Sequence, residues 1–161
     1  MQGIGRTIRR RRKEGRTDYK LRLGLLKSKK ARIVVRKTNK YIVGQLVISN
    51  DAQDKVIAQA YSKELLSNGW PKNLSGSLKS LPASYLTGFL IGKRTGKIKE
   101  GILDIGLHRN VKKSRLYAFL KGLADSGFKI DYNHGVLPDE KDLNKKTETG
   151  NLIKLIKEKL K

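Results

Sequence analysis

The charge of this chain is the feature that most limits how it can fold. Its 161 residues include 37 Lys and Arg against 14 Asp and Glu, a formal net charge of +23. The excess is greatest in residues 1–40, which hold 16 basic and two acidic side chains. Repulsion of this size opposes compaction unless a polyanion lies beside the protein. Nucleic acid is the polyanion we expect, because each phosphate that meets Lys or Arg releases condensed counterions.

Composition argues against several other classes of protein. The chain contains no cysteine, so it has neither disulfides nor thiolate metal sites, as is typical of a cytoplasmic protein. No apolar run approaches the roughly 18 residues that a membrane-spanning helix needs. The basic run at 9–13 lacks the apolar face of an interfacial helix, so we expect no membrane partner.

The charge pattern and the hydrophobic periodicity predict three parts. Residues 1–15 form a basic arm that we expect to stay disordered until it meets its partner, since consecutive cations cannot pack inside a protein. Residues 16–128 form one α/β domain. Residues 129–161 form a C-terminal extension that ends in an amphipathic helix over 149–160.

The first half of the α/β domain is predicted to be a helix followed by strands. A helix over 17–28 has N-cap residues at its start and leucines on one face. Strands over 31–36, 40–48 and 55–61 are joined by short polar links, which predicts an antiparallel meander. We expect residues 62–81 to be mostly loop.

The second half is predicted to be helix, strand, helix. A helix begins with Pro82 at its first position and Ser80 as its candidate cap, and it ends near Thr95. Its regularly spaced small residues predict close packing on a sheet. A short buried strand over 101–105 follows. Ser114 caps the next helix, which ends before Gly127. This order predicts an α/β fold with a mixed sheet flanked by helices, close to a ribonuclease-H-like topology.

The arm and the first helix are the strongest candidate site. Their cations would meet phosphates, and their tyrosine would stack on an unpaired base. A solubilising tail or a nuclear-localisation signal would use the same kind of residues. The predicted RNA-binding residues are Arg6, Arg9, Arg10, Arg11, Arg12, Lys13, Arg16, Tyr19 and Arg22.

A second candidate site is the tip of the first hairpin. Cations at a tight turn project into solvent and suit a nucleic-acid backbone, and an asparagine there can bond a base edge or a 2′-hydroxyl. An ordinary charged turn, with Asn chosen for left-handed geometry, is the alternative. The residues are Arg36, Lys37, Thr38, Asn39 and Lys40.

A third candidate site lies between the buried strand and the helix that Ser114 begins. Ligands of open α/β sheets favour the carboxyl ends of strands, and free N–H groups at a helix start favour phosphate. For His108, the alternative is a surface histidine without a role. The residues are His108, Arg109, Lys112, Lys113 and Arg115.

A catalytic interpretation would need clustered carboxylates. A metal-dependent nuclease holds several acids around divalent ions, and the candidates here are Asp51, Asp54 and Asp104. Two of them fall in a turn and the third stands alone among cations. We therefore expect no enzymatic activity, no metal site, no cofactor and no small-molecule substrate.

Several separate stretches together resemble one known family. The chain resembles, over residues 1–138, the archaeal type of the large-subunit ribosomal protein that binds 5S ribosomal RNA, which is numbered eighteen in bacteria and archaea and five in eukaryotes. The matching stretches are Arg-Arg-Lys-Glu-Gly-Arg-Thr-Asp-Tyr (11–19), Arg-Lys-Thr-Asn-Lys (36–40), Tyr-Ser-Lys-Glu-Leu (61–65), Asn-Gly-Trp (68–70), Ala-Ser-Tyr-Leu-Thr-Gly (83–88) and Leu-Asp-Ile-Gly-Leu-His-Arg (103–109).

The resemblance implies a structural role on the ribosome in the cytoplasm. Its members bind 5S rRNA and help to attach it to the large-subunit rRNA in the central protuberance, beside neighbouring ribosomal proteins. The three candidate sites fall on the stretches that face RNA in that family. The residues alone leave open a generic RNA chaperone and, more remotely, a metal-dependent nuclease of ribonuclease-H-like fold.

Overall fold

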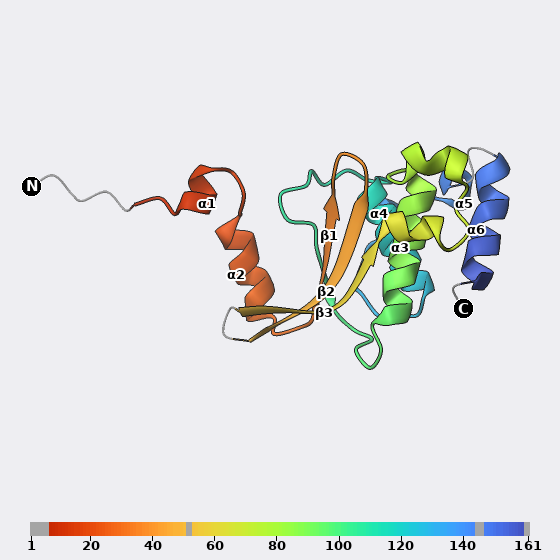
Figure 1. Cartoon of the computed structure of the whole chain (residues 1–161). Helices are drawn as coiled ribbons and strands as arrows, with labels where there is room; N and C mark the ends of the chain where they lie inside the picture. The colour runs from red at the N-terminus through yellow and green to blue at the C-terminus, as the bar shows by residue number, and fades with distance from the viewer. Residues whose placement is uncertain (1–6, 51–52, 144–146, 160–161) are drawn as a thin grey trace, which may run out of the picture.

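A four-stranded sheet forms the centre of the molecule, with α3 and α4 packed on one face and α1 and α2 projecting on the other side (Figure 1). The computed structural model describes residues 7–50, 53–143 and 147–159. The helices are α1 (Arg10–Lys13), α2 (Tyr19–Lys27), α3 (Leu81–Arg94), α4 (Arg115–Asp125), α5 (Glu140–Leu143), α6 (Thr147–Lys159) and the 3₁₀ helices η1 (Ser62–Leu66), η2 (Lys72–Ser77) and η3 (His134–Val136). The strands are β1 (Arg32–Lys37), β2 (Ile42–Asn50), β3 (Gln53–Tyr61) and β4 (Ile102–Asp104).

The sheet is mixed, as the sequence predicted. Its strand order is β3-β2-β1-β4, with antiparallel pairing among the first three strands and parallel pairing between β1 and β4. Strand alternation directs Ile33 and Val35 into the core, while Arg32 and Arg36 point to the opposite face. The α/β fold with a mixed sheet is therefore confirmed, and the ribonuclease-H-like topology stays a prediction.

The main core lies between the sheet and helices α3 and α4. Phe119 on α4 is fully buried and packs over Gly44, the third residue of β2. A β-carbon at Gly44 would lie 2.6 Å from a ring carbon of Phe119, so only glycine leaves room for the ring at this point of the strand. The remaining members of this core include Ile33, Val35, Ile42, Leu46, Ile91 and Leu123.

A second core lies beyond α3 and includes the segment that we expected to be loop. Residues 62–81 instead contain η1 and η2, because this segment buries apolar side chains of its own. Trp70 is 2% exposed, and its indole N–H donates to the carbonyl oxygen of Leu74 at 3.0 Å. Ile153 and Ile156 of α6 pack into the same core, which places the C-terminal helix against α3 (Figure 1).

The small residues of α3 pack against α4, which corrects the prediction that they meet the sheet. A β-carbon at Gly88 would overlap the backbone of Phe119, and one at Gly122 on α4 would overlap the backbone of Tyr85. The two helix backbones are therefore in direct contact. The predicted cap of α3 is confirmed, since the Ser80 hydroxyl accepts a bond from the Ala83 N–H, although Pro82 occupies the second helical position instead of the first.

Helix α2 begins as predicted but does not bury its leucines. The carboxylate of Asp18 accepts hydrogen bonds from the backbone N–H groups of Lys20 and Leu21, which caps the helix. No residue of α2 is buried, and Leu21 is 42% exposed. Residues 10–13 of the arm, which we expected to be disordered, form the single helical turn α1.

None of the helices within the described residues is long and apolar enough to cross a membrane.

Candidate nucleic-acid interface

The arm folds back on itself and brings its arginines to the start of α2. Gly15 has φ +63°, a left-handed conformation that favours glycine, and the Arg16 N–H donates to the Arg11 carbonyl oxygen at 2.8 Å across this reversal. Arg10 pairs with Glu14 at 2.8 Å, and the Nε of Arg11 donates to Thr17. The arm therefore presents its cations in a defined arrangement.

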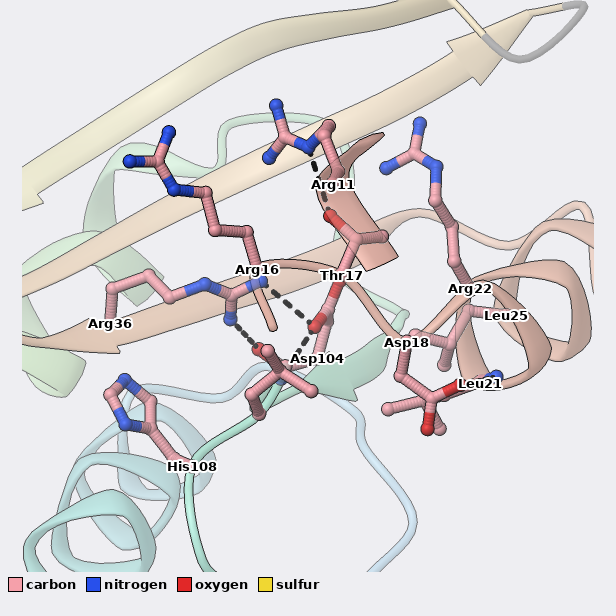
Figure 2. A pocket seen from close by; sticks show the side chains of 12 residues that line it. Arg11, Arg16, Thr17, Asp18, Leu21, Arg22, Leu25, Arg36, Asp104 and His108 are labelled. Atoms are coloured by element: carbon pink, nitrogen blue, oxygen red, sulfur yellow. Dashed lines mark hydrogen bonds and ion pairs between the residues drawn. The ribbon is translucent and has the colours of Figure 1, made fainter. Parts of the chain in front are cut away.

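A cavity of about 330 Å³ separates the arm and α2 from the end of the sheet (Figure 2). Arg11 and Arg16 line it from the arm, and Leu21 and Leu25 line it from α2. The remaining side comes from β1 and from the chain after β4, with Arg36, Asp104, Gly106, Leu107 and His108. This cavity joins the first candidate site to parts of the second and third.

Arg36 is fixed to the chain that follows β4. Its guanidinium donates to the Asp104 carbonyl oxygen at 2.8 Å and to the Asp104 carboxylate at 3.1 Å, as Figure 2 shows. The Gly106 N–H donates to the same carboxylate at 2.8 Å. Gly106 has φ +58°, and a β-carbon there would lie 2.8 Å from the Arg36 guanidinium carbon. Glycine thus lets the loop turn closely around this arginine.

Arg32, which no sequence pattern singled out, lies at the centre of a buried ion network. Its side chain is only 2% exposed and donates to Asp104 at 3.1 Å, to Asp54 at 2.6 Å and to the Ser49 hydroxyl at 2.8 Å. Asp54 also accepts from Arg22 of α2 at 3.0 Å. The network therefore connects α2, β1, the β2–β3 hairpin and the end of β4. Asp104, an acid that stands alone among cations in the sequence, was the signal that could have pointed to it.

Two of the three carboxylates considered for a nuclease form ion pairs with these guanidinium groups. Asp54 and Asp104 both bond Arg32, while Asp51 lies outside the described residues. Burial alone would raise the pKa of Asp54, but hydrogen bonds from Ser49, Arg22 and Arg32 bring it below its usual value. Among the residues that the structure describes, no group of three His, Cys, Asp or Glu could hold a metal ion.

The hairpin tip is held by Thr38. Its N–H donates to the Tyr41 carbonyl oxygen at 2.9 Å, and its hydroxyl accepts from the Tyr41 N–H at 3.0 Å. Asn39 does not have positive φ, so the alternative that Asn was chosen for left-handed geometry is wrong. Residues 38–40 are exposed, which leaves Asn39 and Lys40 facing solvent at the tip.

The loop after β4 carries the third candidate site and lines a cavity of about 430 Å³ with Lys37 and Leu81. Arg109 and Arg115 line this cavity, while Lys113 pairs with Asp139 at 2.5 Å and with Asp142 at 3.4 Å. Hydrogen bonds and the charges of these two acids raise the pKa of Lys113. This lysine is therefore attached to the C-terminal extension.

Ser114 starts α4 without capping it. It occupies the N-cap position, as predicted, but its hydroxyl makes no cap bond to the helix. Within the described residues, its Oγ is the buried side-chain polar atom that lacks a hydrogen-bond partner.

The predicted residues thus divide into groups. Arg11, Arg16, Arg22, Arg36 and His108 line the first cavity, whereas Lys37, His108, Arg109, Lys113 and Arg115 line the cavity beside α4. Arg9, Arg12, Tyr19 and Arg22 line a further cavity on the outer side of α2. Arg10, Lys13, Thr38, Asn39, Lys40 and Lys112 lie on exposed surface outside these cavities, and Arg6 lies outside the described residues.

His108 connects the loop to the hairpin in its neutral form. Its Nε2 accepts a hydrogen bond from the Lys37 backbone N–H at 3.0 Å, so the surface histidine without a role is excluded. Burial lowers the pKa of His108, and the charges of Arg36 and Lys37 lower it further. Because the folded pKa lies below the unfolded value of about 6.5, the stability from this contact is fully present above that pH. It is lost as the pH falls through the folded pKa.

We expect a proton titration to report this contact. In an NMR titration, the Lys37 amide should shift with a midpoint below about 6.5, the ordinary histidine value. His108→Ala should abolish this shift, and His134→Ala, which removes the other histidine, should leave it. A midpoint at or above the ordinary value would contradict the geometry.

Comparisons with known proteins show the family of this chain. An α/β domain whose cations converge from an arm, a hairpin and a helix-start loop belongs to the class of nucleic-acid-binding proteins. Residues 6–101 match the family described as ribosomal large subunit proteins 60S L5 and 50S L18. The chain therefore belongs to this family, and the resemblance stated from its motifs is confirmed.

Archaeal relatives extend the match. The chain is 52% identical over 133 residues to large ribosomal subunit protein uL18 of Korarchaeum cryptofilum, a match that covers 81% of this chain and 66% of the relative. It is 43% identical over 137 residues to uL18 of Methanococcus maripaludis, covering 84% of this chain and 69% of the relative. It is 45% identical over 133 residues to uL18 of Methanothrix thermoacetophila, covering 81% of this chain and 76% of the relative.

Family membership also tests the predicted kind of protein and its predicted location. The family consists of structural constituents of the large ribosomal subunit and not of enzymes, which confirms the predicted class and favours it over a nuclease. It also supports the predicted ribosomal, cytoplasmic location.

Proposed function

We propose that this protein binds 5S rRNA within the large ribosomal subunit and helps to attach it to the large-subunit rRNA in the central protuberance, beside neighbouring ribosomal proteins. The single observation that carries the proposal is the family match over residues 6–101. Ribosomal RNA and ribosomal proteins are the partners that this family implies. The choice of 5S rRNA rests on the resemblance of the motifs at 11–19, 36–40 and 103–109.

The convergence of cations supports RNA as the partner. Residues 1–15 act as an arm, 16–128 as the RNA-binding domain, and 129–161 as an extension. The predicted RNA-binding residues of all three candidate sites act in this proposal as one surface. Guanidinium groups at the first cavity contact phosphates, because Arg11 and Arg16 line it from the arm (Figure 2). Asn39 and Arg109 are the residues that read the shape or the bases of the RNA.

Competition binding tests the proposal. Labelled 5S rRNA is bound to the full chain at about 200 mM salt, where non-specific phosphate contacts are weakened. Excess unlabelled 5S rRNA should displace the label, while transfer RNA and duplex DNA should not. Equal displacement by all three would reject 5S selectivity and favour a generic RNA chaperone.

Substitutions should separate selectivity from general affinity. Arg109→Ala is expected to weaken 5S binding about tenfold, which corresponds to one lost recognition contact, and to weaken binding to an unrelated hairpin much less. Asn39→Ala should act in the same direction. The control is Lys154→Ala, since Lys154 is an exposed lysine on α6 and is not one of the predicted RNA-binding residues. Equal losses on 5S rRNA and on the unrelated hairpin would contradict this assignment.

The salt dependence should report how many phosphates are bound. With about 6–10 phosphates engaged, log affinity should fall against log salt with a slope of about −4 to −9. The double variant Arg11→Gln/Arg16→Gln should make the slope shallower by about two. An unchanged slope would place these two arginines away from the RNA backbone.

A further inference from the structure

The outer side of α2 carries an apolar stripe that the first cavity does not use. Tyr19, Leu23 and Leu26 follow one another at spacings of four and three residues, so they lie along one side of the helix. Leu21 and Leu25 line the first cavity instead. Leu23 is 54% exposed, and Ile8 of the arm, which lines the same outer cavity, is 65% exposed. Side chains this apolar and this exposed indicate a surface that a partner covers.

Cations surround the stripe. The outer cavity, of about 1020 Å³, is lined by Arg9, Arg12, Lys20 and Arg22 beside the apolar residues, and its lining among the described residues includes no acidic side chain. The guanidinium of Arg9 lies 4.8 Å from the centre of the Tyr19 ring. An apolar floor with a basic rim matches a nucleotide, whose base is flat and apolar on its faces and whose phosphate is anionic.

We propose that this outer surface of α2 binds unpaired nucleotides of RNA, with bases against Ile8, Leu23 and Leu26 and beside the stacked Tyr19 and Arg9. The inference rests on the proposed function for RNA as the partner and adds the kind of RNA. Double-stranded RNA hides its base faces, so only an unpaired segment can use the apolar stripe. A second copy of this chain is disfavoured, because it would bring another net charge of +23 to a cavity lined by four cations.

The consequence is that α2 has two RNA-binding sides. The first cavity, with its arginines and Asp104, suits a sugar–phosphate backbone, while the outer surface suits exposed bases. Burial of α2 is thereby completed by RNA on both sides, which explains a helix with four leucines and no buried residue.

Base dependence of binding tests the inference. Fluorescence anisotropy on the full chain compares an oligoadenylate of about 12 nucleotides with an abasic ribose-phosphate chain of the same length and charge. The wild type should bind oligoadenylate about tenfold more tightly, as expected when a base stacks on the protein. Leu23→Asn should bring this ratio close to one and leave the affinity for the abasic chain unchanged. Leu155→Asn is the matched control, since Leu155 on α6 is equally exposed at 55%.

Three outcomes would overturn the inference. Equal affinity of the wild type for the two chains removes the base contact, and an unchanged ratio in Leu23→Asn places it elsewhere. Self-association that Leu23→Asn abolishes would assign the surface to a second copy. The competition with 5S rRNA is independent of these measurements. Loss of base preference with 5S selectivity intact rejects only this inference, and base preference without 5S selectivity rejects only the proposed function.

Discussion

Replacing Arg32 by methionine should lower the free energy of unfolding by about 3–5 kcal/mol, the loss typical of removing one partner from a buried ion pair. Methionine has a similar volume, so the loss reports the unpaired carboxylates and not a cavity. Arg32 is 2% exposed and bonds both Asp54 and Asp104, which retain only their outer partners after the change. Urea unfolding at pH 7 measures the effect.

Lys30→Ala is the matched control for Arg32→Met. Lys30 stands two residues earlier and pairs with Glu100 at 2.8 Å, but both groups are on the exposed surface. Exposed pairs contribute little to stability, so unfolding should hardly change. A similar loss in both variants would mean that burial of the Arg32 network contributes nothing special.

The same network should make stability depend on acid. The pKa of Asp54 is lowered in the folded protein, so its contribution is fully present above the unfolded value of about 3.9. It is lost as the pH falls through the lower folded pKa. The difference in unfolding free energy between wild type and Asp54→Asn should therefore shrink below about pH 4. A constant difference across this range would contradict the ion pairing of Asp54.

Local signals in the sequence were sufficient for most elements of the fold. Asp18 and Ser80 cap helices where the sequence predicted, and the strand expected over 31–36 is present as β1. These features depend on neighbours a few residues away, so the pattern itself contains the reason for them. The mixed sheet followed from the order of such elements.

Features that depend on distant partners were missed. Arg32 looks like an exposed strand cation until Asp54 and Asp104, which lie 22 and 72 positions further along the chain, are brought beside it. Residues 62–81 look like a loop because their apolar side chains, including Trp70, are buried in a core that they share with α3 and α6. Tertiary contacts, and not local propensity, order this segment.

In the candidate sites, too, local features could be predicted from the sequence, whereas features that depend on distant residues could not. Runs of cations identified the arm, the hairpin and the loop as separate basic segments. Their grouping around the first cavity depends on the Gly15 reversal and on the attachment of Arg36 to Asp104. Periodicity placed leucines on one face of the first helix, but periodicity reports that a face is covered without reporting whether protein or RNA covers it.

Replacing Gly122 by alanine should lower the free energy of unfolding by about 3 kcal/mol, although alanine is the better helix former. A β-carbon at Gly122 would overlap the Tyr85 carbonyl oxygen and lie 2.8 Å from its carbon. The obstacle is backbone of α3, which cannot rotate away as a side chain can. The two helices must therefore separate, and the contact at Gly88 on the other helix is lost with it.

Gly24→Ala in α2 provides the control for this prediction. Nothing lies within 4 Å of the position of its β-carbon, so helix propensity alone should act and stability should rise by up to about 1 kcal/mol. Thermal unfolding of both variants measures the two signs in one experiment. Opposite signs would show that α3 and α4 hold the domain together through backbone contact. A gain at both positions would mean that the helices can separate without loss, and the tight packing of the second half of the domain would then need another cause.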